Sequence, residues 1–273
     1  MAQRMRRVRD AAAALTATAA VAVVTVLVLA PGDGGEGGAE VAAAAAAKAA
    51  PGVNTGPVAV EAEDNLPSWT AGEWVTYADH VVVVTATSQS EIAPQAHEIE
   101  RGEGIVGRNV MLKIDKVLWS RADAAKPAPA TWNSSALGWH FTESNLADRR
   151  EMVVADRPRM EVGHTYILAM EWDEARCSEG DETVPAQWRG LGAGSELPYD
   201  GGVIGNGEQA GRTQSVSRAK APRAQGIEAE AVVEEVLAGQ PESALVSALK
   251  AAKPVPTDGY LTKTADSAKA ACA

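Results

Sequence analysis

The chain has 273 residues, a formal net charge of −11 at pH 7 and only 4% aromatic residues. This acidic balance argues against nucleic acid and anionic lipid as the main partner of the folded part, because both are themselves densely negative. Setting aside residues 1–68, which read as an apolar stretch and a low-complexity region, leaves roughly 205 residues. That length suits one domain and a small appendage.

The N-terminus combines a basic cluster with a long apolar stretch. Residues 1–10 contain four arginines, and Ala11–Ala30 contains no charged residue. As a helix, 20 residues span about 30 Å, the thickness of a hydrocarbon core. The basic flank predicts a cytoplasmic segment at 1–10 and a single-pass membrane anchor at Ala11–Ala30, with the remainder outside the cytoplasm. The alternative is a signal peptide that is removed to give a secreted protein, although Pro31 is a poor residue to follow a cleavage site.

Composition divides the rest of the chain into five segments. Residues 31–68 are rich in Gly, Ala and Pro and read as a disordered tether. Residues 69–205 carry the strand patterns of the domain. We expect a linker at 206–224, a helical appendage at 225–253 and a C-terminal tail at 254–273.

The first two expected strands carry informative patterns, although the strongest strand prediction is the later segment 162–173. Residues 74–88 are rich in Val, Thr, Tyr and Trp, and the run of four valines predicts a strand that is covered on both faces. In residues 108–119 the apolar positions change parity along the strand. Because side chains alternate across a sheet, this change predicts a β-bulge near Asp115 and Lys116.

Further strands follow without helices long enough for parallel crossovers. Alternation predicts strands at 137–144, 151–156 and 162–173, and short strands around Trp188 and Val203. The expected fold class is therefore mainly β, a small closed antiparallel barrel. The N-terminal transmembrane or signal helix precedes it, and two short C-terminal helices follow it.

Four segments carry a resemblance to a known family: YADHVVVVTATSQ, RNVMLKIDKVLWS, VGHTYILAMEW and LPYDGGVIG. Together, across about residues 74–205, they resemble secreted or membrane-anchored proteins of unknown function from actinobacteria. The domain of those proteins is similar to the netrin-like, oligonucleotide-binding-type barrel of tissue inhibitors of metalloproteinases. The resemblance implies a fold and a compartment outside the cytoplasm. It does not imply inhibitor activity, because those inhibitors bind the protease metal through an N-terminal cysteine that this domain lacks.

The two C-terminal helices are expected at 226–239 and 241–253. Each has an apolar stripe, the first ends at Gly239 and the second begins at Pro241, which suits a first helical turn. A stripe of this kind usually packs on a core, so we expect the helices to cover the sheet. Binding a partner protein is the alternative.

Motifs for catalysis, cofactors and metals give no convincing match. Residues 190–194, GLGAG, lack the flanking strand and helix of a dinucleotide loop, and Ser195 is not in a nucleophile elbow. The four histidines show no metal-ligand spacing, and the acidic residues of 171–183 lack the order of a calcium loop. We therefore assign no catalytic, cofactor or metal residue.

One aromatic segment is the only candidate for a ligand surface. Trp139, His140 and Phe141 interleave aromatic and polar groups within a strand. If Trp139 and Phe141 face the core, His140 faces outward, and barrels of this type bind ligands across a strand face. Core packing is the alternative, since alternation alone explains it.

The two cysteines, Cys177 and Cys272, are predicted to form a disulfide, because an even count outside the cytoplasm favours pairing. Two unpaired thiols are the alternative. The sequence as a whole favours a non-catalytic, membrane-tethered domain that binds an unidentified protein or ligand of the cell envelope. A secreted hydrolase and an envelope signalling component remain the alternatives.

Overall fold

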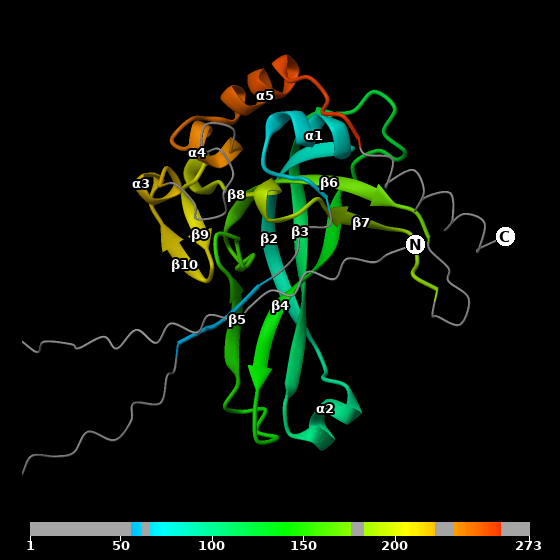
Figure 1. Ribbon diagram of the computed structural model, residues 1–273, viewed down its shortest axis with the longest axis vertical. Helices are drawn as coiled ribbons and strands as arrows, with labels where there is room; N and C mark the ends of the chain where they lie inside the picture. Colours follow the sequence, from blue (N-terminus) through cyan, green and yellow to red (C-terminus); the bar gives the residue numbers. More distant parts are fainter. Residues whose placement is uncertain (1–55, 62–65, 176–182, 222–231, 258–273) are drawn as a thin grey trace, which may run out of the picture. The chain divides into compact units, whose positions relative to one another are not determined.

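The computed structural model describes residues 56–61, 66–175, 183–221 and 232–257, and it is mainly β (Figure 1). No helix within these ranges is long and apolar enough to cross a membrane. The expected anchor Ala11–Ala30 lies outside the described residues.

Eight strands of the described chain form one sheet, in the order β1-β5-β4-β3-β2-β6-β7, with β8 joined to β6. Every neighbouring pair is antiparallel except β1 and β5, which are parallel. The strands are Val58–Val60 (β1), His80–Ile92 (β2), Gly104–Ser120 (β3), Thr131–Phe141 (β4), Arg150–Val154 (β5), Thr165–Asp173 (β6), Gln187–Gly190 (β7) and Glu196–Pro198 (β8).

The prediction of a closed barrel is wrong. The sheet curls so that β4 and β7 approach each other, but no hydrogen-bonded ladder joins them. Closure fails because β5 pairs with β4 at only two positions and then takes β1 as its partner. Within the described residues after β8, no further strand joins this sheet, and Val203, expected in a strand, lies outside one.

The predicted bulge in the second long strand is confirmed. Val83 pairs with Lys116 and the next residue, Val84, pairs with Ile114, so Asp115 is the extra residue on β3. Extra residues of this kind increase the local twist of a strand. The bulge therefore helps the long β2–β3 hairpin to curl.

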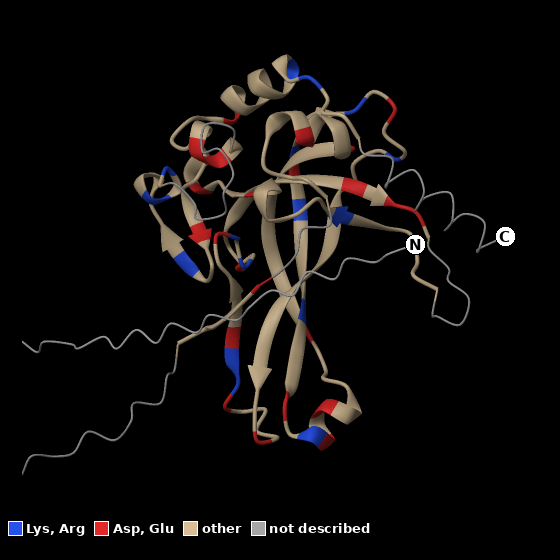
Figure 2. Cartoon of the chain, viewed as in Figure 1, with Lys and Arg blue, Asp and Glu red and all other residues tan. Residues whose placement is uncertain are grey.

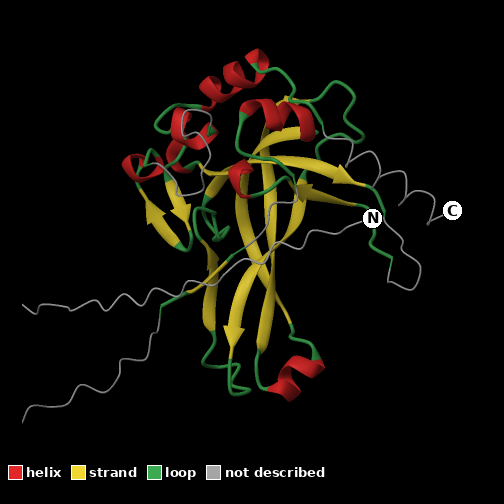
Figure 3. Cartoon of the chain, viewed as in Figure 1, coloured by secondary structure: helices red, strands yellow, loops and turns green. Residues whose placement is uncertain are grey.

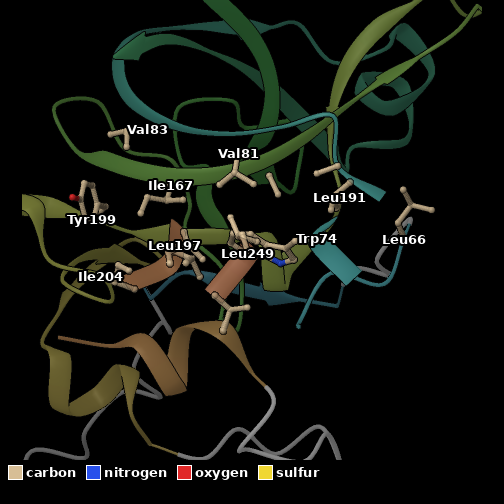
Figure 4. Close-up of a cluster of buried hydrophobic side chains, with 14 residues drawn as sticks. Leu66, Trp74, Val81, Val83, Ile167, Leu191, Leu197, Tyr199, Ile204 and Leu249 are labelled. Atoms are coloured by element: carbon tan, nitrogen blue, oxygen red, sulfur yellow. The ribbon is translucent and has the colours of Figure 1, made fainter. Parts of the chain in front are cut away.

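The valine run is covered on both faces, as predicted. Val81 and Val83 belong to one buried cluster, which also contains Ile167, and Val82 and Val84 belong to another on the opposite face. Figure 4 shows the first cluster, where the side chains of the sheet meet those of the helices. Burial on both faces explains why the run shows no alternation of apolar and polar residues.

The strand predicted from Trp74 begins later than expected. Ala71–Tyr77 is a helix, α1, and its first turn is closed by a reciprocal cap between Thr70 and Glu73. The Thr70 side chain accepts a bond from Glu73 N, and the Glu73 carboxylate accepts one from Thr70 N. This S/T-x-x-E signal overrides the strand preference of the aromatic and β-branched residues. Trp74 is fully buried under the helix.

The linker predicted at 206–224 is also wrong over most of its length. It contains a two-stranded sheet, Gly207–Gln209 (β9) and Arg212–Gln214 (β10), followed by the helix Val216–Ala219 (α3) (Figure 3). These residues look polar and Gly-rich in the sequence. They are ordered through long-range contacts, above all those of the Glu208 carboxylate described below.

The C-terminal helices cover the sheet, as expected. Val233–Leu237 (α4) and Glu242–Ala251 (α5) place Val233, Leu245 and Leu249 in the same buried cluster as Val81. The remaining short helices are Ala96–Arg101 (α2), Ala193–Ser195 (η1) and Asp200–Gly202 (η2). The described end of the expected tether at 31–68 is not free either, because Val58–Val60 pairs with β5, and Leu66 is buried.

Candidate binding cleft

A cleft opens where β4 and β5 separate. The two strands pair only at Trp139 with Glu151 and at His140 with Arg150. Beyond this point they enclose a cavity of about 210 Å³. Its lining comes from residues 134–137 of β4, Val153 and Val154 of β5, the loop 157–160 and Glu196 of β8, and we call it the β4–β5 cleft.

Arg159 bridges the two strands where their ladder ends. Its Nε donates to Met152 O of β5 at 3.1 Å, and Nη2 donates to Gly138 O of β4 at 3.0 Å. The side chain is 1% exposed, and Nη1 is paired with Glu161. A guanidinium presents several donors in one fixed plane, so it can replace two ladder bonds across a widened gap.

The Glu208 carboxylate holds the loop that forms one wall of the cleft. It accepts bonds from Arg159 N at 3.0 Å and Met160 N at 3.1 Å. The Tyr166 hydroxyl and Gly211 N also donate to it, both at 2.7 Å. Glu208 is 2% exposed, so these four bonds replace the water that a buried carboxylate would otherwise need.

A second buried arginine completes the polar network. Arg108 is fully buried, donates from Nη1 to Gln89 at 2.8 Å and bonds to Arg159 O through Nη2. Burial and the neighbouring Arg159 lower the pKa of Arg108, while Glu161 and Glu208 oppose this shift. Two arginines thus face two carboxylates, which satisfies the requirement that buried charges be paired.

Burial and the neighbouring Glu208 shift the pKa of the Tyr166 hydroxyl in the same direction. Burial, then the charge of Glu208, raises the pKa of Tyr166 well above its usual value. The hydroxyl therefore stays protonated and acts as a fixed hydrogen-bond donor to Glu208. The network is rigid scaffolding beneath the cleft and not a source of protons.

An ion pair forms the rim of the cleft on the side of β8. Arg157 Nε lies 2.5 Å and Nη2 lies 2.6 Å from the two carboxylate oxygens of Glu196. Such two-point pairing fixes geometry as well as charge. The rim therefore carries no net charge from this pair, and most of the remaining lining is aliphatic, from Leu137, Val153, Val154, Pro158 and Met160.

The three residues predicted as a ligand surface follow the cleft-lining residues on β4, and none of them lines the cleft. Phe141 is 1% exposed and belongs to the core. Trp139 is half-buried, with the guanidinium carbons of Arg149 and Arg159 at 4.5 Å and 5.2 Å from its ring centre. His140 Nε2 lies 3.1 Å from a Glu103 oxygen on the other face. The alternation that the sequence predicted is present, and a ligand role for these residues stays a prediction.

A separate half-buried cluster of charge lies at the far end of β6. Burial, followed by the neighbouring Asp173, raises the pKa of Glu171 to about 7. Asp79, which is 1% exposed, accepts Trp172 N at 2.7 Å and is paired with Arg121. Figure 2 shows that both signs of charge are distributed over the described elements. Among these residues, no group of three or more His, Cys, Asp and Glu side chains has the geometry to hold a metal ion.

The cysteines Cys177 and Cys272 lie outside the described residues, so the disulfide stays a prediction. Comparison with protein-family models, curated proteins and solved structures gives no match. Sequence reasoning missed the β4–β5 cleft, although Arg157 and Arg159 around Pro158 form a cluster of charge and rigidity next to a strand end.

Proposed function

We propose that the chain is a membrane-tethered binding protein that acts outside the cytoplasm, without catalysis, and that its ligand site is the β4–β5 cleft. The observation that carries the proposal is the network that the buried Arg108, Arg159 and Glu208 form with the partly exposed Glu161. It holds open a gap in the sheet that direct pairing of β4 and β5 would have filled.

The free-energy cost of burying these charges supports a binding function for the cleft. Burying ions is expensive, and apolar residues of similar volume often stabilise a fold as well or better. A sheet continued from β4 to β5 would need none of these charges. A rigid, charge-neutral, partly aliphatic recess is instead the usual form of a small binding site.

The lining of the cleft supports binding over catalysis. The hydroxyl of Ser135 lies 3.4 Å from the amide oxygen of Asn109, which is not a general base. Arg157 and Glu196 neutralise each other, and the Tyr166 proton is held by Glu208. The groups around the cleft are therefore arranged to position a ligand by shape and hydrogen bonds.

The proposed location of the β domain outside the cytoplasm rests on the N-terminal sequence. The arginines of 1–10 and the uncharged Ala11–Ala30 support a membrane anchor with the β domain on the outer side, or a secreted form after cleavage. The ligand would then be a protein or small molecule of the cell envelope. The curled sheet with helices on one face also supports the netrin-like resemblance, in a form that is open between β4 and β7.

The proposal is tested in intact cells that produce the full-length chain. A photo-crosslinking amino acid is placed at Ser135 in the cleft and, as a matched control, at the exposed Glu100 of α2. Added protease should degrade the β domain without lysis, and Ser135 should form a discrete adduct that Glu100 does not. A chain protected from external protease, or identical adducts at both positions, would refute the proposal.

A further inference from the structure

The segment of β4 that lines the cleft is a free strand edge. Ile114 N donates to Ala130 O at 3.0 Å, and the register pairs Val110 with Ser134 and Arg108 with Ala136. Because hydrogen-bonded pairs alternate in an antiparallel ladder, the backbone groups of Ser134 point toward β3. Those of Asn133 and Ser135 point the other way, toward the cleft.

No backbone hydrogen bond in the described chain joins Asn133 or Ser135 to a strand on that outer side. Ser135 and Asn133 are both exposed, so the edge is accessible. A bulge at Leu137 and Gly138 ends the regular alternation, and Arg159 caps the carbonyl of Gly138. The free edge is therefore short and has a defined end.

We propose that the β4–β5 cleft binds an extended peptide segment of another protein, which adds as a strand to β4. The peptide would exchange backbone hydrogen bonds with Asn133 and Ser135 and place one aliphatic side chain in the cavity. This inference rests on the proposed function and names the ligand class of the same site.

The side-chain preference follows from the alternation of β4. Trp132 and Ala136 face the inner cluster, so Ser134 shares that face. The peptide residue opposite Ser134 points to the same side, where Val153, Val154 and Met160 form the wall. These apolar groups, with the rim neutralised by the pair of Arg157 and Glu196, suit an uncharged aliphatic side chain.

A thin segment fits this edge better than a second copy of the chain. The cavity of about 210 Å³ lies between β4, the loop 157–160 and Glu196 of β8, and it has room for a single side chain. An added strand would lie next to β4, on the side where no hydrogen-bonded ladder joins β4 to β7. Free edges are templates for this kind of pairing, and strand addition is a common mode of peptide recognition.

The test uses the full-length chain and fluorescein-labelled, acetylated pentapeptides with a central residue flanked by serine and threonine. The central residue is Val, Leu, Lys or Asp, and a further Val peptide carries N-methyl groups on both neighbours of the valine. Polarisation should show the aliphatic peptides binding about tenfold or more tightly than the charged ones. N-methylation should abolish binding, since it removes the donors that pair with β4.

Two variants at one position separate backbone pairing from side-chain contacts. Ser135→Pro removes the outward N–H and should abolish binding while leaving the β3–β4 ladder intact, because proline is tolerated at a free edge. Ser135→Ala keeps the backbone N–H, so any loss it causes reports the side chain alone and should be much smaller than the loss caused by Ser135→Pro. The urea midpoint of each variant reports folding, and the N-methylated peptide tests pairing independently if Ser135→Pro is unstable.

Binding that survives N-methylation or a folded Ser135→Pro variant would overturn strand addition, as would failure of every peptide to bind the folded chain. A dimer of the unchanged chain that Ser135→Pro dissociates would overturn it in favour of a second copy. Failure of the peptides together with a discrete adduct at Ser135 in cells would leave the cleft as the site and reject only this ligand class. Failure of both experiments would reject the proposed function as well.

Discussion

Replacing Glu208 by glutamine removes one negative charge from the network beneath the cleft with almost no change of shape. The carboxylate accepts four hydrogen bonds, from Arg159 N, Met160 N, Gly211 N and the Tyr166 hydroxyl. A glutamine side chain keeps a single acceptor oxygen. Its NH₂ group must face either two backbone donors, or one backbone donor and the hydroxyl.

The less costly orientation keeps the oxygen opposite Arg159 N and Gly211 N. The Tyr166 hydroxyl can then rotate to accept from the amide, but Met160 N–H is left buried without an acceptor. An orphaned buried donor costs about 1–3 kcal/mol, and the remaining bonds lose the extra strength of a charged acceptor. Arg108 and Arg159 also lose part of their compensating charge, so we expect a total loss of about 3–4 kcal/mol.

Urea unfolding of the full-length chain at pH 7, followed by tryptophan fluorescence, measures this loss. Glu100→Gln on the exposed face of α2 is the control and should leave the midpoint unchanged. Hydrogen exchange should also become faster in the loop 157–160. A loss of stability of less than about 1 kcal/mol for Glu208→Gln would refute the role of the network, because that is the scale of a single neutral hydrogen bond.

Three further predictions concern other parts of the chain. Gly138→Ala should destabilise the fold by at least about 2 kcal/mol in the same urea assay, since its Cβ would lie 2.0 Å from a carbonyl oxygen of β3. Burial and Asp173 raise the pKa of Glu171 from 4.5 to about 7, so stability should fall as pH rises through this window. Glu171→Gln should abolish that fall, of at most about 3 kcal/mol, and an unchanged profile would exclude Glu171 as its source. Counting free thiols on the denatured, unreduced chain should give none if Cys177 and Cys272 are bonded, whereas two per chain would exclude the bond.

Local patterns in the sequence were enough to predict most strands. The change of parity between Ile114 and Val117 located the bulge at Asp115, because alternation is a property of the strand itself. The apolar stripe of α5 likewise predicted that Leu245 and Leu249 face the core. The cap formed by Thr70 and Glu73 was present in the sequence as well, and it would have identified α1.

The open form of the sheet and the shape of the cleft depend on contacts between distant residues. Glu208 meets Arg159 across 49 positions of sequence, and no periodicity marks either residue as buried. The separation of β4 from β5 depends on the Arg159 guanidinium bonding to Gly138 and Met152. Polar residues of this kind are predicted to lie on the surface or in a linker, because the sequence does not show which charges will be paired.

Hydrogen exchange of the full-length chain, with and without solubilised envelope extract from the producing cells, directly tests whether the β4–β5 cleft is the binding site. If the β4–β5 cleft binds a ligand, exchange should become slower in residues 131–137 of β4 and in the loop 157–160, which together line or adjoin it. The end of the β2–β3 hairpin around α2 should exchange as it does in buffer. Protection confined to that hairpin end, or no protection at the cleft, would contradict the claim that the cleft is the binding site.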